Sequence, residues 1–412
     1  MIPAHVIIPL AYRQALANRR FRLFTVGFGV SSLGDGMSAL AVAWLAIEIS
    51  SPANRGLVVG AAVAAYTLPG AIGLFLKRLL GNLDSGRLLL LNCVLRAVCL
   101  GAIALLAFVG RLEVVSYVVL LAASALLSSW GTAARYSLVA ETLPESSRLA
   151  GNALLGSLLN AGFIAGPAIA GFLAASSGAA TVLALDALSW LVYAGCVLLA
   201  QAPHEPVAAP GQDTRSALRM ILGDRTLLGL LLLTLAFFFF YGPVEVALPI
   251  FVKDDLHQSA AVLGAYWTFF GVGATTGGFA FGILRRAPLF TTAIVIIVGW
   301  GATLAVIPFV SAPLGIVAFT LGGLIWAPYP TLITTFLQHQ ASGRALTALS
   351  ATWTSATMLA TPLGTAVGGP IVAATGAAHT LFISAVATLA IVPFAVMTKL
   401  IRNEEARAAQ RS

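Results

Sequence analysis

Twelve apolar segments follow one another along the 412-residue chain, and they constrain its fold more than any single motif. About 20 apolar residues in helical conformation span the hydrocarbon core of a bilayer, and a backbone in lipid has to satisfy its own hydrogen bonds. The sequence therefore predicts an all-α membrane protein with twelve transmembrane helices. The segments cover approximately residues 23–46, 57–76, 88–109, 114–135, 150–174, 180–200, 227–251, 261–284, 289–310, 314–336, 345–372 and 377–399.

The composition excludes other classes of protein. Hydrophobic residues make up 59% of the chain and charged residues 9%, whereas about a quarter of a soluble domain is charged. The net charge of +8 is spread over short loops, so no nucleic-acid interface is predicted. Cys93, Cys99 and Cys196 all lie in apolar segments, which predicts packing residues rather than disulfides or metal ligands.

An internal repeat divides the chain into two related halves. Three glycines of the fifth segment and its end recur 198 residues later in the eleventh: Gly166, Gly171 and Gly178 match Gly364, Gly369 and Gly376. We therefore predict two pseudo-symmetric six-helix bundles, residues 1–200 and 226–412. The proline-rich residues 201–225 between them are predicted to be a solvated cytoplasmic linker.

Basic residues indicate the orientation of the chain in the membrane. One set of alternate loops holds nineteen Lys and Arg and the other holds three, while Arg96 lies inside the third segment. Because basic loops stay in the cytoplasm, both termini are predicted to be cytoplasmic in a multi-pass protein of the plasma (inner) membrane. The first twenty residues lack a short apolar segment with a cleavage site, so no removable signal peptide is predicted.

The fifth segment contains a stripe of small residues around a proline. Gly162, Gly166 and Gly171 lie four and five residues apart, which lets a neighbouring helix approach closely, and Pro167 favours a bend. Together with Gly364 and Gly369 of the eleventh segment, these residues are predicted to form a helix-packing and hinge motif.

These features carry a resemblance that covers nearly the whole chain. Six plus six helices around a linker resemble the major facilitator superfamily, and Gly162 to Gly171 is similar to its antiporter motif G-x-x-x-G-P-x-x-G-G, with Ala170 in place of a glycine. Further matches resemble the drug:proton antiporter branch that contains macrolide-efflux and enterobactin-export proteins. They are Ser32–Gly36, Leu95–Ala97, Ala150–Ala153 and Tyr241–Pro249. The resemblance implies a proton-coupled exporter.

The loop after the second segment departs from the family pattern G-x-x-x-D-R-x-G-R-[KR]. Asp84, Gly86 and Arg87 are present at shifted spacing, and Lys77 and Arg78 add charge where small residues are expected. We predict that Asp84 and Arg87 belong to a cytoplasmic gate loop that is latched differently from that of the family.

Two carboxylates inside apolar segments are predicted to couple transport to protons. Asp35 lies about twelve residues into the first segment, and ~1.5 Å per residue places it ~18 Å deep in a ~30 Å core. A carboxylate removed from water binds a proton more readily. The alternative for Asp35 is a packing role beside its glycines. Glu245, between Pro243 and Pro249, is either a second proton or substrate residue or a gate residue near the outer mouth.

Three other charged residues are predicted to have structural roles. The resemblance places the third and sixth helices outside the transport cavity, so Arg96 and Asp186 are expected to pair or to reach the membrane surface. Arg135, at the inner end of the fourth segment, is expected to anchor a loop through Glu141 or Glu145.

Aromatic side chains indicate the kind of substrate. The helix arrangement that the resemblance implies makes a set of residues available to the cavity, which suits a bulky, partly apolar or cationic ligand. The alternative is that many of them lie at the membrane interfaces, as expected for Trp44 and Trp267. The predicted cavity residues are Tyr66, Trp130, Asn160, Tyr241, Trp326, Tyr329 and Trp353.

Other chemistries find no support in the sequence. The glycine strings lack the residues of a phosphate-binding loop, the five histidines are scattered, and no nucleophile, base and acid recur together, so no catalytic residue, metal or cofactor is predicted. We predict a monomeric, proton-coupled exporter of small amphipathic or hydrophobic molecules, including drugs, that works by alternating access. Two alternatives stay open: a dedicated exporter of an endogenous siderophore or antibiotic, and an uncoupled lipid-moving protein on the same scaffold.

Overall fold

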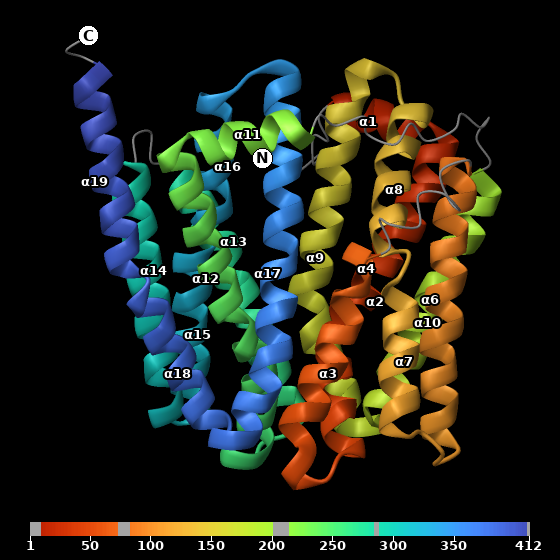
Figure 1. Cartoon of the computed structure of the whole chain (residues 1–412). Coiled ribbons are helices and arrows are strands. Elements are labelled where there is room, and N and C mark those ends of the chain that lie inside the picture. Colours follow the sequence, from red (N-terminus) through yellow and green to blue (C-terminus); the bar gives the residue numbers. More distant parts are fainter. Residues whose placement is uncertain (1–9, 73–82, 201–213, 284–287, 410–412) are drawn as a thin grey trace, which may run out of the picture. The chain divides into compact units, whose positions relative to one another are not determined.

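The computed structural model describes residues 10–72, 83–200, 214–283 and 288–409, and every regular element within these ranges is a helix (Figure 1). The predicted all-α membrane class is confirmed, since ten helical stretches of the described residues are long and apolar enough to cross a membrane. The second predicted segment forms α3 (Arg55–Thr67) and α4 (Pro69–Ile72), which end at the edge of the described residues. The eighth forms α13 (Ala260–Ile283), which is rich in glycine and threonine. The count of twelve spans stays a prediction.

The chain forms two compact units. The described residues of Met1–Ala41 and Ala65–Ala209 make unit 1, and those of Val42–Ala64 and Pro210–Ser412 make unit 2. The predicted bundles 1–200 and 226–412 stay a prediction. Residues 201–213 of the predicted linker lie outside the described residues, and the rest of it contains α11 (Thr214–Gly223).

Unit 1 is a helical bundle in which α6 packs against α7, α8 and α10, and α9 packs against α1, α8 and α10. Its elements are α1 (Leu10–Ala17), the first part of α2 (Arg19–Ile49), α4, α6 (Ser85–Phe108), α7 (Val114–Ala125), α8 (Ser128–Thr142), α9 (Glu145–Ser177) and α10 (Ala179–Ala200).

Unit 2 pairs α12 with α17, α13 with α15, and α18 with both α12 and α14. The amphipathic α11 lies on α17, with Ala217 and Ile221 buried. The elements are the end of α2, η1 (Pro52–Asn54), most of α3, α11, α12 (Arg225–Ile250), the π-helical turn η3 (Phe251–Asp255), α13, α14 (Leu289–Val306), η4 (Ile307–Phe309), α15 (Ala312–Trp326), α16 (Pro328–Gln340), α17 (Gly343–Thr375), α18 (Ala377–Ala390) and α19 (Val392–Ala409).

The repeat seen in the sequence corresponds to matched helix ends. α9 and α17 are each 33 residues long and continue through their internal prolines. Both end at a glycine with positive φ, Gly178 at +83° and Gly376 at +85°, a backbone conformation that glycine adopts without the steric cost of a side chain. The two glycines are repeat partners, so the sequence repeat has a structural counterpart.

Glycines bring α9, which contains the Gly162–Gly171 motif, into backbone contact with α2 within unit 1. A Cβ atom added to Gly162 would meet the backbone of Ser32, and one added to Gly166 would lie 2.7 Å from Cα of Gly36. Real Cβ atoms do not approach other atoms so closely, so only glycine allows this helix separation. The predicted small-residue stripe is thus the contact of α9 with the helix that carries Asp35.

Unit 2 repeats this contact between α12 and α17. A Cβ atom on Gly242 would meet the backbone of Gly364 and Thr365, and one on Gly368 would lie 2.7 Å from Cα of Pro243. Each unit therefore contains a glycine-dependent helix pair that includes a half-buried carboxylate, Asp35 on α2 or Glu245 on α12.

Within unit 2, the segment Val42–Ala64 is held on α17 and on the end of α12. A Cβ atom on Gly60 would lie 2.7 Å from Cα of Gly369, and one on Gly56 would lie 2.7 Å from the Gly369 carbonyl oxygen. The Arg55 guanidinium pairs with the Asp254 carboxylate, and Lys253 Nζ lies 5.1 Å from the Trp44 ring centroid. Two kinds of contact therefore fix this segment, close glycine packing and charge.

The Arg55–Asp254 pair gives a measurable prediction. The two side chains are 20% and 33% exposed, so solvent screens part of their attraction, and a coupling free energy of about 0.5–1 kcal/mol is expected. In a double-mutant cycle, Arg55→Ala and Asp254→Ala should each lower thermal stability in detergent, and the double variant should lose less than the sum. Strict additivity would show that the pair contributes nothing.

Candidate functional site

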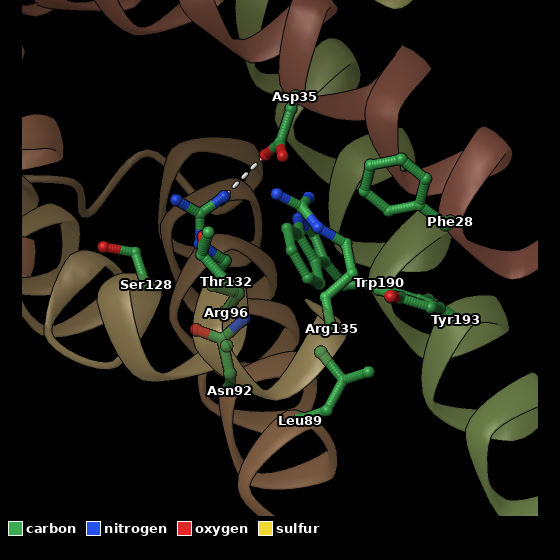
Figure 2. A pocket seen from close by; sticks show the side chains of 11 residues that line it. Phe28, Asp35, Leu89, Asn92, Arg96, Ser128, Thr132, Arg135, Trp190 and Tyr193 are labelled. Atoms are coloured by element: carbon green, nitrogen blue, oxygen red, sulfur yellow. Dashed lines mark hydrogen bonds and ion pairs between the residues drawn. The ribbon is translucent and has the colours of Figure 1, made fainter. Parts of the chain in front are cut away.

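The central feature of unit 1 is an ion pair between two apolar helices. Arg96 Nη1 on α6 lies 2.5 Å from Asp35 Oδ1 on α2, and the two side chains are 10% and 27% exposed (Figure 2). The Tyr66 hydroxyl donates to the same carboxylate oxygen at 3.5 Å. Charged groups within membrane helices are costly and mark functional sites. The structure therefore joins the predicted coupling residue Asp35 to the predicted cavity residue Tyr66.

Aromatic rings hold the Arg96 guanidinium in place. Its Cζ atom lies 4.8 Å from the ring centroid of Trp190 on α10 and 5.4 Å from that of Tyr66. Cation–π contacts of this kind are strongest when the cation is desolvated, as it is here. The expectation that Arg96 pairs with another residue is met, and its partner is the residue predicted to carry the proton.

A cavity of about 80 Å³ lies beside this ion pair. Asp35, Arg96 and Arg135 line it together with Asn92, Trp190 and Tyr193, so α6 and α10 contribute to it (Figure 2). These are the third and sixth predicted helices, which the family resemblance placed outside a transport cavity. The cavity within unit 1 is therefore lined in part by two helices that were not expected to contribute to a binding site.

Arg135 differs from its expected role as a loop anchor. Its guanidinium Cζ lies 4.6 Å from the Phe28 ring centroid, and Figure 2 shows the side chain directed toward the Asp35 end of the cavity. The Glu141 carboxylate instead accepts a hydrogen bond from Ser85. The reason is geometric, because Arg135 lies on the face of α8 (Ser128–Thr142) that looks into unit 1.

Asp186 is completely buried and is held by serines. Its carboxylate accepts hydrogen bonds from Ser38 on α2 and from Ser189, the latter at 3.0 Å. A Cβ atom on Gly34 would meet both Asp186 and Ser189, so glycine at this position lets α2 and α10 approach. These contacts hold Asp186 between α2 and α10, and its structural role stays a prediction.

Glu245 has a simpler environment in unit 2. The Thr365 hydroxyl donates to its carboxylate at 3.3 Å and lies on α17, beside the close Gly242–Gly364 contact. Among the described residues no ion pair reaches Glu245. Its role in proton coupling stays a prediction.

The other predicted cavity residues fall into different environments. In unit 2, Tyr241 lies 5.8 Å from Trp300 and 6.3 Å from Trp326 between ring centroids, and Tyr329 is fully buried with its hydroxyl 3.1 Å from that of Thr234. The remaining three lie on other helices: Trp353 is buried on α17, Trp130 is buried on α8, and Asn160 is exposed on α9. Their contact with substrate stays a prediction.

The predicted gate residues lie at the start of α6. Asp84 caps the helix by accepting a hydrogen bond from the backbone N–H of Arg87, whose Nε lies 3.2 Å from the carboxylate. Lys77, Arg78 and residues 79–82 lie outside the described residues. The gate function of Asp84 and Arg87 stays a prediction. Across the part of the chain that the structure describes, no group of three His, Cys, Asp or Glu side chains is arranged to hold a metal ion.

The lining residues that were not predicted for the site include Asn92, Arg135, Trp190 and Tyr193. A signal for three of them was present in the sequence. Asn92 precedes Arg96 by one helical turn, and Trp190 and Tyr193 follow Asp186 by one and two turns, so each shares a helix face with a buried charge.

Comparisons with known proteins agree with this architecture. A family model described as Major Facilitator Superfamily matches residues 24–361. The "Multidrug efflux pump Tap" proteins of Mycobacterium tuberculosis (strain ATCC 25618 / H37Rv) and Mycobacterium bovis (strain BCG / Pasteur 1173P2) are 27% identical over 382 residues, which cover 86% of this chain and 87% of the relative. The crystal structure of nucleoside transporter NupG superposes with a TM-score of 0.74 at 14% identity, covering 92% of this chain and 99% of NupG, which shows the shared fold. A mutant form of NupG gives a TM-score of 0.69. Since the family model matches well over half of the residues, this chain belongs to the Major Facilitator Superfamily.

Proposed function

We propose that this protein is a proton-coupled exporter of small amphipathic or hydrophobic molecules, including drugs. It acts as a monomer in the plasma (inner) membrane, with both termini in the cytoplasm, and opens its substrate site alternately to the two sides. The similarity to the multidrug efflux pump Tap over most of both chains supports an efflux role. The positive-inside count supports the orientation.

The observation that carries the proposal is the Asp35–Arg96 ion pair beside a cavity. A proton that binds Asp35 removes its negative charge and releases Arg96 from the pair. Antiport requires that proton binding and substrate binding oppose each other. Because Arg96 contacts both Asp35 and the cavity, a proton on Asp35 changes the site that the substrate uses, and the two binding events are linked through one side chain.

Glu245 is proposed as the second coupling residue. It lies in the glycine-dependent pair of α12 and α17, as Asp35 lies in that of α2 and α9. Helices that touch through backbone atoms are closely packed, and closely packed elements transmit strain to one another. The Gly162–Gly171 stretch of α9 and its counterpart in α17 are proposed as the bending elements.

Transport by the purified protein tests this proposal. In proteoliposomes that contain a pH-sensitive dye in the lumen, an imposed proton gradient should drive Nile red, an uncharged amphipathic dye, against its concentration gradient. Dye movement should be accompanied by proton flux in the opposite direction, and an uncoupler should abolish it. Transport that continues with the uncoupler present would point instead to an uncoupled carrier such as a lipid mover. A panel of endogenous metabolites would identify a dedicated exporter if no drug or dye is moved.

A further inference from the structure

The cavity in unit 1 is lined by residues with buried polar atoms that have no hydrogen-bond partner among the described residues. Trp190 Nε1, the Tyr193 hydroxyl and Arg96 Nε make no hydrogen bond within the described part of the chain, although these residues are only 6%, 2% and 8% exposed. One acceptor, Asn92 Oδ1, is also unpaired there. Buried donors without partners are uncommon in folded proteins, because each has lost its hydrogen bonds to water. Three around one small cavity indicate that an acceptor enters it.

The charges around the cavity indicate which acceptor that is. Two guanidinium groups, Arg96 and Arg135, face it with one carboxylate, Asp35. The other carboxylate nearby, Asp186, is fully buried and its oxygens are taken by Ser38 and Ser189. A cationic group in the cavity would lie beside the guanidinium groups and is disfavoured, whereas an oxygen with lone pairs meets several donors at once.

We propose that this cavity is the subsite for an oxygen acceptor of the exported molecule, a carbonyl group above all, and that it discriminates against cations. The proposal rests on the exporter function proposed above and names its substrate class. Trp190 and Tyr193 donate to the oxygen from α10, and Arg96 donates through Nε while its Nη1 holds Asp35. The cavity volume of about 80 Å³ accommodates such a group but not a whole drug, so the remainder of the molecule lies outside it.

This arrangement gives Arg96 a positioning role between proton and substrate. The ionised Asp35 carboxylate fixes the Arg96 guanidinium with Nε at the cavity. A proton on Asp35 ends that ion pair, and the acceptor then loses one of its donors. Proton binding therefore weakens substrate binding, which is the sign of linkage that antiport requires.

A matched pair of dyes tests the subsite directly. Nile red carries a carbonyl oxygen at the position where Nile blue, on the same ring system, carries a cationic iminium nitrogen. Binding to the purified full-length protein in nanodiscs is measured by fluorescence, with the signal of empty nanodiscs subtracted. Nile red is expected to bind at least about tenfold more tightly than Nile blue, since one lost charged or buried hydrogen bond is worth roughly that factor.

Two conservative variants locate the site. Tyr193→Phe and Trp190→Phe remove one donor each and keep most of the ring, and each should weaken Nile red binding about fivefold while leaving Nile blue binding unchanged. Tyr266→Phe is the matched control, because Tyr266 in unit 2 also has a fully buried hydroxyl without a partner among the described residues. It should bind Nile red like the wild type. Gel filtration shows whether each variant is folded.

Three results would overturn the subsite: Nile blue binding as tightly as Nile red, no binding of either dye, or Nile red binding that Tyr193→Phe leaves unchanged in a folded protein. Because binding is measured without a proton gradient, its outcome is separate from that of the transport assay. Selective binding of Nile red without transport would contradict the exporter function and leave the subsite in place.

Discussion

Asp35→Asn is expected to abolish proton-driven export while leaving the protein in the membrane. Asparagine keeps the size of the side chain and one acceptor oxygen, but it cannot bind and release a proton, and it removes the charge that pairs with Arg96. Coupling free energies between two ligands correspond to factors of roughly 5 to 150, so uncoupler-sensitive efflux of Nile red should fall by at least about tenfold. Initial efflux rates from energised proteoliposomes, normalised to inserted protein, measure this loss.

Asp186→Asn is the matched control for Asp35→Asn. Asp186 is another carboxylate within the helices of unit 1, but it is fully buried, is held by Ser38 and Ser189, and pairs with no arginine in the described residues. The variant should lower stability by about 1 kcal/mol, the worth of one hydrogen bond, and keep coupled transport. Equal transport loss in both variants would show that any buried carboxylate change damages unit 1. Full coupled export by Asp35→Asn would make Asp35 a packing residue and direct attention to Glu245.

The membrane class and the family were predictable because they depend on the lengths of apolar segments and on local motifs. The length of an apolar segment indicates whether it can span a bilayer. The depth of Asp35, which follows from its position along the segment, stays a prediction. The small-residue stripe of Gly162 and Gly166 likewise predicts that some helix approaches α9. Which helix approaches was not predictable, since its contact residue Gly36 lies more than 120 positions away in the sequence.

The partners within the site were less predictable for a physical reason. A soluble helix shows its buried face by apolar residues that recur every three to four positions, but α6 and α10 are apolar almost all round. Their rotation about the helix axis is therefore set by packing and not by a visible pattern. This is why Trp190 was not predicted beside Arg96, and why Arg135 was expected to reach a loop instead of Phe28.

Gly166→Ala is expected to separate α9 from α2 and to impair both stability and transport. The added methyl carbon would lie 2.7 Å from Cα of Gly36, and a backbone atom cannot move aside as a flexible side chain can. The helices have to shift, and overpacking of this kind costs about 1–3 kcal/mol. For a unit of this size, about 1 kcal/mol corresponds to a fall of about 2–4 °C in the apparent unfolding temperature. Thermal unfolding in detergent measures it.

Gly156→Ala on the same helix provides the control. Gly156 is exposed, and a Cβ atom there would meet nothing within 4 Å, so alanine should leave stability unchanged or raise it by up to about 1 kcal/mol through its higher helix propensity. If both variants behave alike, the close contact of α9 with α2 is absent from the working protein. A lower unfolding temperature for Gly166→Ala alone would show that one methyl group at the backbone contact disturbs the packing of α9 against α2. Because α2 also carries Asp35, the Gly162–Gly171 motif would then support the helix that forms the ion pair with Arg96.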